Sequence, residues 1–187
     1  MDDLEVAQFL HLLLYNKKLR NVVNAVTSKA VLILGRFTPE RKVVLDVIRD
    51  ELRKRNYIPI LFDFKRPDSP DLTETIMTLD LTETIMTLAH LARFIIADIT
   101  DAHSIPQELQ AIIPALEVPV QPLLQSSTKE YALFASFKKY PWVLQEYLYV
   151  NTDDLFASIG EKVIAPAEAK ANDLELRKRG SQGIIGS

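Results

Sequence analysis

Acidic and hydroxyl side chains gather directly after a short apolar run near the middle of the chain. Phe94–Ala97 is apolar without polar alternation, which is typical of a strand buried on both faces of a sheet. This run is followed by Asp98, Thr100, Asp101 and Ser104, and Glu108 falls in the first turn of the next helical pattern. Open α/β sheets keep their ligand sites in such strand-to-helix loops. These residues are therefore the first candidates for a catalytic or binding site.

A second group of candidates follows the strand predicted over 29–34. The connection from this strand to the next helix consists of Gly35, Arg36, Phe37 and Thr38. Thr38 is placed to cap that helix, and Pro39 suits its first helical position. The two groups of candidates thus occupy equivalent strand-to-helix loops.

Strands and helices alternate along most of the chain. Apolar runs predict strands over 29–34, 57–64, 94–97, 118–124 and 143–150. Helical spacing predicts helices over 3–26, 38–55, 80–92, 104–115, 131–140 and 153–170. This alternation, with right-handed crossovers, favours a flavodoxin-like three-layer α/β/α sandwich whose five parallel strands have the order 2-1-3-4-5. In that order the first and third strands are neighbours, so the two candidate loops line one crevice.

The chain divides into three parts. Residues 1–28 form an N-terminal helical extension, 29–170 form the α/β domain, and 171–187 form a charged and then glycine-containing flexible tail. The extension carries a wide apolar face. This face either docks on the domain, contacts a partner or connects to an upstream module.

Residues 71–88 contain an exact tandem duplication of the nonapeptide DLTETIMTL. Nine residues turn a helix by about 900°, so the apolar stripe of the second copy faces half a turn away from that of the first. One stripe cannot serve both copies of a continuous helix. We expect the second copy, 80–88, to be the core helix that precedes the 94–97 strand. The first copy, 71–79, is then displaced into an extra turn or a projecting helix.

The composition indicates the cellular compartment and disfavours some classes of binding partner. The 187 residues are 48% hydrophobic and 25% charged, as in soluble globular proteins, and the formal charge of −3 disfavours a nucleic-acid or membrane-surface binder. Cysteine is absent, which excludes disulfides and thiolate chemistry, and the three histidines lack metal-ligand spacing. With an acidic amino terminus and no apolar run long enough to cross a bilayer, we expect a cytoplasmic protein.

Four short motifs resemble those of bacterial Toll/interleukin-1 receptor (TIR)-like domains, which are related in fold to nucleoside 2-deoxyribosyltransferases. The motifs are Val31–Phe37, Phe62–Phe64, Arg93–Asp98 and Ser104–Leu109. The last is similar to the family pattern of a serine, a short spacer and Glu-Leu, although Ile105-Pro106 replaces the usual aromatic residue and cysteine. The resemblance covers roughly 29–170 and implies relatives in which another module precedes this domain.

This resemblance implies a nucleotide-binding domain that hydrolyses the N-glycosidic bond of NAD or a related nucleotide, with no further cofactor and no metal. Glu108 matches the catalytic carboxylate, which would stabilise or trap the oxocarbenium charge of the breaking bond. Arg36 and the amides after Gly35 would face a diphosphate, and Phe37 would stack on a base or nicotinamide ring. The implied nucleotide-binding residues are Gly35, Arg36, Phe37, Thr38, Asp98, Asp101 and Ser104.

Two other functions fit the same resemblance. One is a non-catalytic signalling module that self-associates into a homo-oligomer, and the other is an enzyme similar to a nucleoside deoxyribosyltransferase. The candidate residues also have simpler roles open to them. The helix dipole alone favours Glu108 in a first turn, Asp98 and Asp101 suit turns, and Arg36 suits a solvated surface.

Overall fold

The computed structural model describes residues 16–63, 83–100, 107–126 and 136–182. The strands are β1 (Ala30–Gly35), β2 (Ile58–Asp63), β3 (Phe94–Asp98), β4 (Val120–Gln125) and β5 (Tyr147–Tyr149). The helices are α2 (Lys17–Thr27), α3 (Pro39–Lys54), α5 (Gln107–Ala115), α7 (Thr152–Ile159) and α8 (Ala165–Gln182), with shorter turns η1 (Ser136–Lys139) and η2 (Gly160–Ile164). A further helical stretch covers 83–91.

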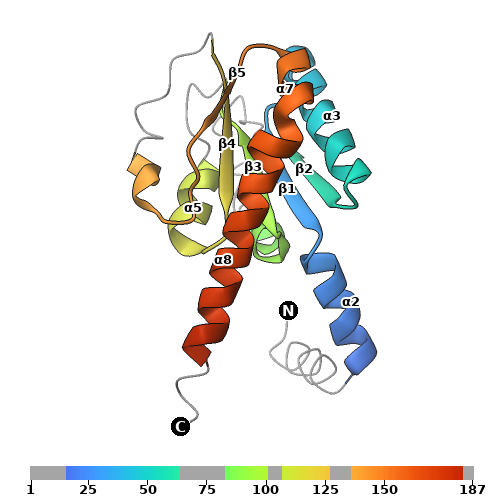
Figure 1. The fold of residues 1–187 in the computed structure, drawn as a ribbon, viewed down its shortest axis with the longest axis vertical. Helices are drawn as coiled ribbons and strands as arrows, with labels where there is room; N and C mark the ends of the chain where they lie inside the picture. Colours follow the sequence, from blue (N-terminus) through green and yellow to red (C-terminus); the bar gives the residue numbers. More distant parts are fainter. Residues whose placement is uncertain (1–15, 64–82, 101–106, 127–135, 183–187) are drawn as a thin grey trace, which may run out of the picture.

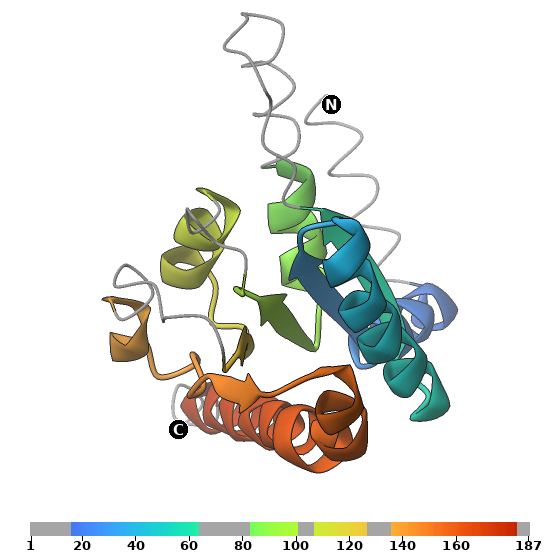
Figure 2. The ribbon, with the colours of Figure 1, turned by 90° about the horizontal axis from the view of Figure 1, so that it is seen from above.

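The five strands form one parallel sheet in the order β2-β1-β3-β4-β5. Helices α3, α7 and α8 cover one face, while α5 and the 83–91 helix cover the other (Figures 1 and 2). The predicted fold class and strand order are therefore confirmed. The carboxyl ends of all five strands lie at one edge of the sheet, because every neighbouring pair is parallel.

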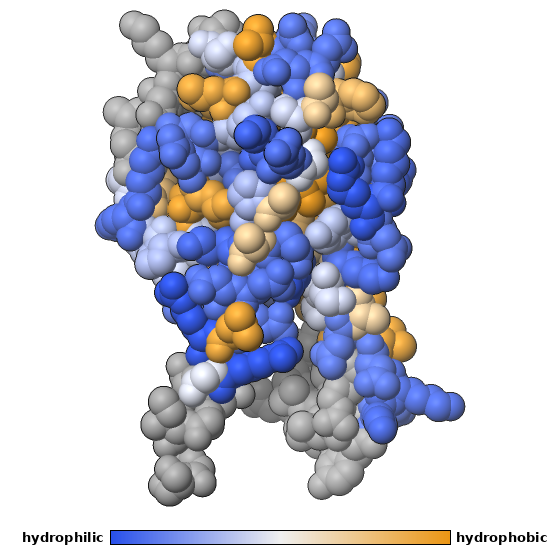
Figure 3. Space-filling model, viewed as in Figure 1, coloured by the Kyte–Doolittle hydropathy of each residue, from blue (hydrophilic) through white to orange (hydrophobic). Residues whose placement is uncertain are grey.

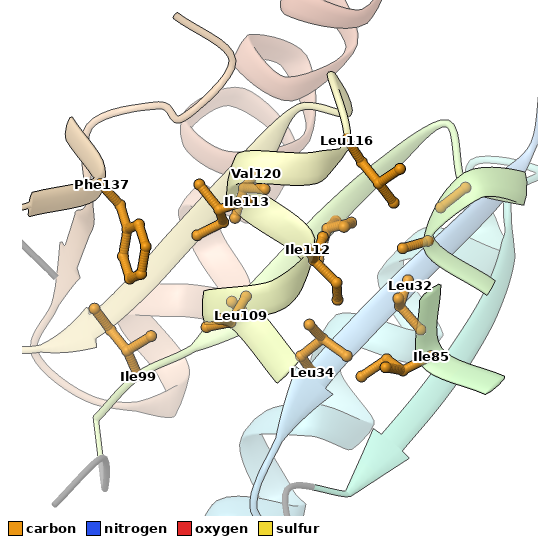
Figure 4. Packing of buried hydrophobic residues seen from close by; sticks show 14 of the residues in the cluster. Leu32, Leu34, Ile85, Ile99, Leu109, Ile112, Ile113, Leu116, Val120 and Phe137 are labelled. Atoms are coloured by element: carbon orange, nitrogen blue, oxygen red, sulfur yellow. The ribbon is translucent and has the colours of Figure 1, made fainter. Parts of the chain in front are cut away.

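Each face of the sheet has its own hydrophobic core. On the α5 face, Leu32 and Leu34 of β1 pack with Ile85 of the 83–91 helix and Ile112 of α5, as Figure 4 shows. On the α3 face, Ile33 and other strand residues pack with side chains from α3, α7 and α8. Strands buried on both sides explain why β1 and β3 are apolar runs without alternation.

The second copy of the duplicated nonapeptide supplies the helix at 83–91, as predicted, and the first copy lies outside the described residues. Ile85 of this copy and the following Ala89 are fully buried, and Ala92 is nearly so. If the first copy took this place in the core, Asp80 would stand at the position of Ala89. Burying an unpaired carboxylate is costly, so the alanines after the second copy determine which copy the core uses.

The last helix extends further than the sequence pattern predicts. The flexible tail was expected from 171, whereas α8 continues to Gln182. Ala171 and Leu174 are buried against the body of the protein. Arg93, at the start of β3, also pairs with Glu168 at 2.8 Å and with Glu175 at 2.9 Å. These contacts with a distant residue hold the charged sequence in a helix.

Tyr57, just before β2 at the amino edge of the sheet, also contacts Glu168, one of the two carboxylates paired with Arg93. Its hydroxyl donates to Glu168 Oε2 at 3.0 Å. Burial and the neighbouring Glu168 carboxylate raise the pKa of Tyr57 to about 12. Tyr57 therefore stays neutral, as a hydrogen-bond donor, at every ordinary pH.

Other boundaries differ from the predicted ones at the proline-containing and short elements. The fourth strand begins at Val120 and the fifth is only Tyr147–Tyr149, with Val143 forming an isolated bridge to Val120. The described end of the helix predicted over 131–140 is a single 3₁₀ turn, η1. The helix predicted over 153–170 is interrupted by the π-helical η2.

Helix α2 precedes β1 in the chain and projects away from the sheet at the amino end of that strand (Figure 1). Val22 is 59% exposed and Val26 is 41% exposed, so these valines of the predicted apolar face are not buried by the described body. On the face seen in Figure 3, hydrophobic residues form small separate spots among hydrophilic ones. The division into an extension and a domain stays a prediction.

Deleting the first nonapeptide, 71–79, should leave the melting temperature equal or slightly higher. The core uses the second copy, and halving the connection between β2 and the 83–91 helix gains about 0.6 kcal/mol of closure entropy. Thermal unfolding measures the change. As a contrast, Ala89→Asp should destabilise the fold strongly, because it puts a carboxylate in the core. A large loss on deletion would show that both copies are needed.

Replacing Arg93 by Met should lower the free energy of unfolding by about 1 kcal/mol, because its carboxylate partners are partly solvated. Amide exchange over 172–182 should become faster, since the contacts of Arg93 with Asn172 and Glu175 are lost. Lys178→Met, which replaces an exposed cation on the same helix, is the control and should change neither quantity. Unchanged exchange in Arg93→Met would contradict this explanation of the longer helix.

Candidate functional site

The carboxyl ends of β1 and β3 form the switch point of the sheet. These strands are direct neighbours, and the chain leaves β1 toward α3 on one face but leaves β3 toward α5 on the other. Doubly wound sheets bind their ligands where the connections diverge in this way. The structure therefore places Gly35 and Asp98, the strand ends from which the two selected loops start, next to each other.

Gly35 ends β1 at a point of close contact with α3 and β3. A Cβ atom at this position would lie 2.8 Å from Leu45 Cδ2 and 3.5 Å from Asp98 Cβ. A side chain here would push against Leu45, which is buried in the α3-face core. The glycine thus allows α3 to begin directly over the end of the sheet.

Arg36 and Phe37 are exposed at this edge, and Phe37 retains 45% of its accessible surface. The loop that carries them is held at both ends. Phe37 N donates to Asp63 Oδ1 of β2 at 3.0 Å, and Thr38 Oγ1 accepts from Arg41 N at 3.3 Å as the predicted helix cap. An exposed cation and an exposed aromatic ring therefore project from an anchored loop.

Asp98 forms a buried ion pair with Arg41 just below this loop. Arg41 Nε lies 2.9 Å from Asp98 Oδ2, and the two side chains are 8% and 2% exposed. The other carboxylate oxygen accepts from Thr100 N at 3.2 Å and from Thr100 Oγ1 at 2.6 Å. Both oxygens of Asp98 are thus already occupied by protein groups.

The rest of the Arg41 guanidinium reaches the two strands that lie beyond β3 in the sheet, β4 and β5. Nη1 donates to Gln125 Oε1 at 2.9 Å at the end of β4, and Nη2 donates to the hydroxyl of Tyr149 in β5. Gln125 N donates to Thr100 Oγ1 at 3.0 Å. We call these five residues, Arg41, Asp98, Thr100, Gln125 and Tyr149, the anchor cluster.

Interactions within the anchor cluster shift the pKa values of Arg41 and Tyr149. Burial alone would lower the pKa of Arg41, but Asp98 and Tyr149 outweigh it and raise the pKa above its ordinary value. Burial, together with the Asp98 charge, raises the pKa of Tyr149. Arg41 therefore stays a cation and Tyr149 stays a neutral hydroxyl across the physiological range.

Of the other three predicted site residues, the structure describes only the backbone of one. Glu108 lies in the first turn of α5, at the carboxyl edge, but its side chain is outside what the structure describes. Asp101 and Ser104 belong to the 101–106 segment, which also lies outside the described residues. The roles given to these three residues, and the ligand contact expected of Asp98, stay predictions.

Of the anchor cluster, sequence reasoning proposed Asp98 as a site residue, noted Thr100 only among the polar residues after the strand, and missed the other three. One signal was available for Arg41. A basic side chain in the first turn of a helix opposes the helix dipole, which favours acidic residues there. Arg41 at such a position indicates an acidic partner from elsewhere in the fold. No local sequence pattern distinguishes Gln125 and Tyr149.

Comparison with known proteins gives the fold but no family. No protein-family model matches the chain, and no curated protein matches its sequence. A diflavin flavoprotein A3 from Nostoc sp. has a similar structure, with a TM-score of 0.52 and 12% identity over 83% of this chain and 98% of that chain. A CMP N-glycosidase from Clostridium botulinum gives a TM-score of 0.47 and 15% identity over 71% of this chain and 99% of that chain. These likenesses concern the fold alone, and the fold is flavodoxin-like.

Two features are absent from the part of the chain that the structure describes. None of its helices is long and apolar enough to cross a membrane. Its histidine and acidic side chains include no group of three or more placed to hold a metal ion.

Replacing Arg41 by Met should lower the free energy of unfolding by about 3–5 kcal/mol, because Asp98 is left as an unpaired buried charge. Urea denaturation at pH 7 measures the loss. Arg36→Met, in the exposed loop just before α3, is the control and should change the free energy of unfolding by no more than about 0.5 kcal/mol. Equal, small effects of both substitutions would contradict the burial of the pair.

Proposed function

We propose that this chain binds a nucleotide at the carboxyl edge of β1 and β3 and cleaves its N-glycosidic bond, with NAD as the first substrate to test. The observation that carries the proposal is the switch point between these strands, with Arg36 and Phe37 exposed beside it. The TIR-like motifs of the sequence support the reaction type, and the flavodoxin-like fold supports the location.

Arg36 is the better candidate for the diphosphate contact than the loop amides. The N–H group of Phe37 already donates to Asp63, and Pro39 at the start of α3 has no N–H to offer. A guanidinium can form paired, charge-assisted hydrogen bonds with phosphate oxygens. The exposed ring of Phe37, one residue away, suits stacking on a base or nicotinamide ring.

Glu108 is the proposed catalytic carboxylate. Its position in the first turn of α5 places its backbone at the same edge of the sheet as Arg36. Cleavage of a bond between ribose and a base leaves positive charge on the anomeric carbon as the base departs with the bonding electrons. A carboxylate stabilises that charge, or bonds to the carbon until water replaces it.

A second candidate is a signalling module that self-associates and does not turn a nucleotide over. The exposed Val22 and Val26 on the projecting α2 favour this alternative, because exposed apolar helix faces commonly mark contacts between proteins. The occupied carboxylate of Asp98 also removes one acidic group from the set available to a substrate.

Binding is tested by titrating NAD into the protein in a calorimeter. Arg36→Ala and Phe37→Ala should each raise the dissociation constant roughly tenfold, since each removes one ligand contact. Arg53→Ala, at the far end of α3, and Phe156→Ala, on α7, are matched controls with exposed side chains. Equal effects of the site and control variants would refute the proposed location.

Turnover is tested by following nicotinamide release from NAD. Glu108→Gln should lower the rate by about a hundredfold or more while keeping the dissociation constant, because it removes charge and not shape. Glu117→Gln, an exposed residue just beyond the other end of α5, is the control. Hydrolysis that survives in Glu108→Gln would refute its role. Binding without any hydrolysis would favour the signalling module.

A further inference from the structure

Arg41 and Asp98 join two parts of the molecule that leave the sheet in opposite directions. Arg41 lies in the first turn of α3, three residues after Thr38, and Asp98 is the last residue of β3. We infer that this pair acts as a positioning device, which sets the spacing between the 36–38 loop and the start of the β3–α5 connection. The inference rests on the proposed function, since a role in binding requires that function, but the effect of the pair on the two loops can be tested without a ligand.

The guanidinium of Arg41 ties α3 to three strands. Its three nitrogens donate to Asp98 of β3, Gln125 of β4 and Tyr149 of β5. A planar guanidinium presents its donors in a rigid fork, so contacts in three directions fix its position more tightly than a lysine ammonium would be fixed. The amino end of α3 is thus held relative to strand ends across half the sheet.

The same pair fixes how the chain leaves β3. Asp98 Oδ1 accepts from both the backbone and the hydroxyl of Thr100, and the hydroxyl in turn accepts from Gln125 N. The backbone at Thr100 is therefore tied to Asp98 on one side and to β4 on the other. Both sides of the proposed nucleotide site begin from groups that the Arg41–Asp98 pair holds.

Stability alone does not account for such a pair. Replacing a buried ion pair by apolar residues of similar volume is often neutral or even stabilising. An apolar pair would fill the same space, but it would supply none of the directional contacts to Gln125, Tyr149 and Thr100. The double replacement Arg41→Met/Asp98→Leu therefore separates the loss of position from the loss of folding.

The experiment compares the wild type with this double variant by thermal unfolding, amide exchange and NAD titration. The diagnostic amides are Phe37 N, which donates to Asp63, and Lys42 N, which donates to Thr38 O, because neither donates to the replaced side chains. We expect a melting temperature within about 4 °C of the wild type. Exchange at these two amides should be roughly tenfold faster, and NAD should bind roughly tenfold more weakly.

Lys138→Met/Glu146→Leu is the matched control, since it removes an ion pair of the same 2.9 Å length away from this edge. It should leave exchange at Phe37 and Lys42 unchanged. A folded Arg41→Met/Asp98→Leu variant with wild-type exchange at both amides would overturn the inference.

If the double variant does not fold, Arg41→Lys decides the matter, because it keeps the charge beside Asp98 and loses only the fork. Faster exchange at Phe37 in this variant supports the inference, and wild-type exchange overturns it. If wild-type protein binds no NAD, the proposed function fails, and the exchange measurements still decide whether the pair positions the two loops.

Discussion

A buried ion pair between Arg41 and Asp98 is the constraint on which the carboxyl edge of this protein depends. Two charges leave water at a cost that their mutual attraction offsets only when other groups complete their hydrogen bonds. Thr100, Gln125 and Tyr149 complete them, so all five members of the anchor cluster are needed together. Because the cluster spans α3, β3, β4 and β5, the order of the strands is built into its geometry. A strand order that separated β3 from β1 would take Asp98 away from Arg41 and leave a buried charge without a partner.

The anchor cluster divides the residues of this edge into two kinds. Asp98 looked like a ligand residue because carboxylates after buried strands often are. In the structure its oxygens contact Arg41 and Thr100, which gives it a structural role at this edge, and its contact with a ligand stays a prediction. Arg36 and Phe37, a few residues earlier in the chain, carry similar chemistry at the surface. In the proposed function, Asp98 supports the structure while Arg36 and Phe37 contact the ligand, and these two exposed residues can change with little effect on the fold.

Patterns local in sequence predicted most of the fold. The apolar runs of β1 and β3, the Thr38 cap and the use of the second nonapeptide copy all follow from neighbouring residues. The features that sequence reasoning missed depend on distant partners. Arg41 meets Asp98 across 57 positions and Tyr149 across 108, and no local pattern carries such a pairing. The extra turns of α8 have the same origin, since Arg93 holds Glu175 across 82 positions. The meeting of the β1 and β3 ends was therefore predictable, but the anchor cluster that connects them was not.

The proposed nucleotide site lies at the carboxyl ends of β1 and β3, and amide chemical shifts test this location most directly. Titration of isotope-labelled protein with NAD should move the resonances of Phe37, Thr38, Ile99 and Thr100 in a saturable way. The resonances of Lys29 and Arg93, at the amino ends of the same strands, should stay in place. Saturable shifts centred on the amino edge, or no shifts at millimolar NAD, would contradict the account.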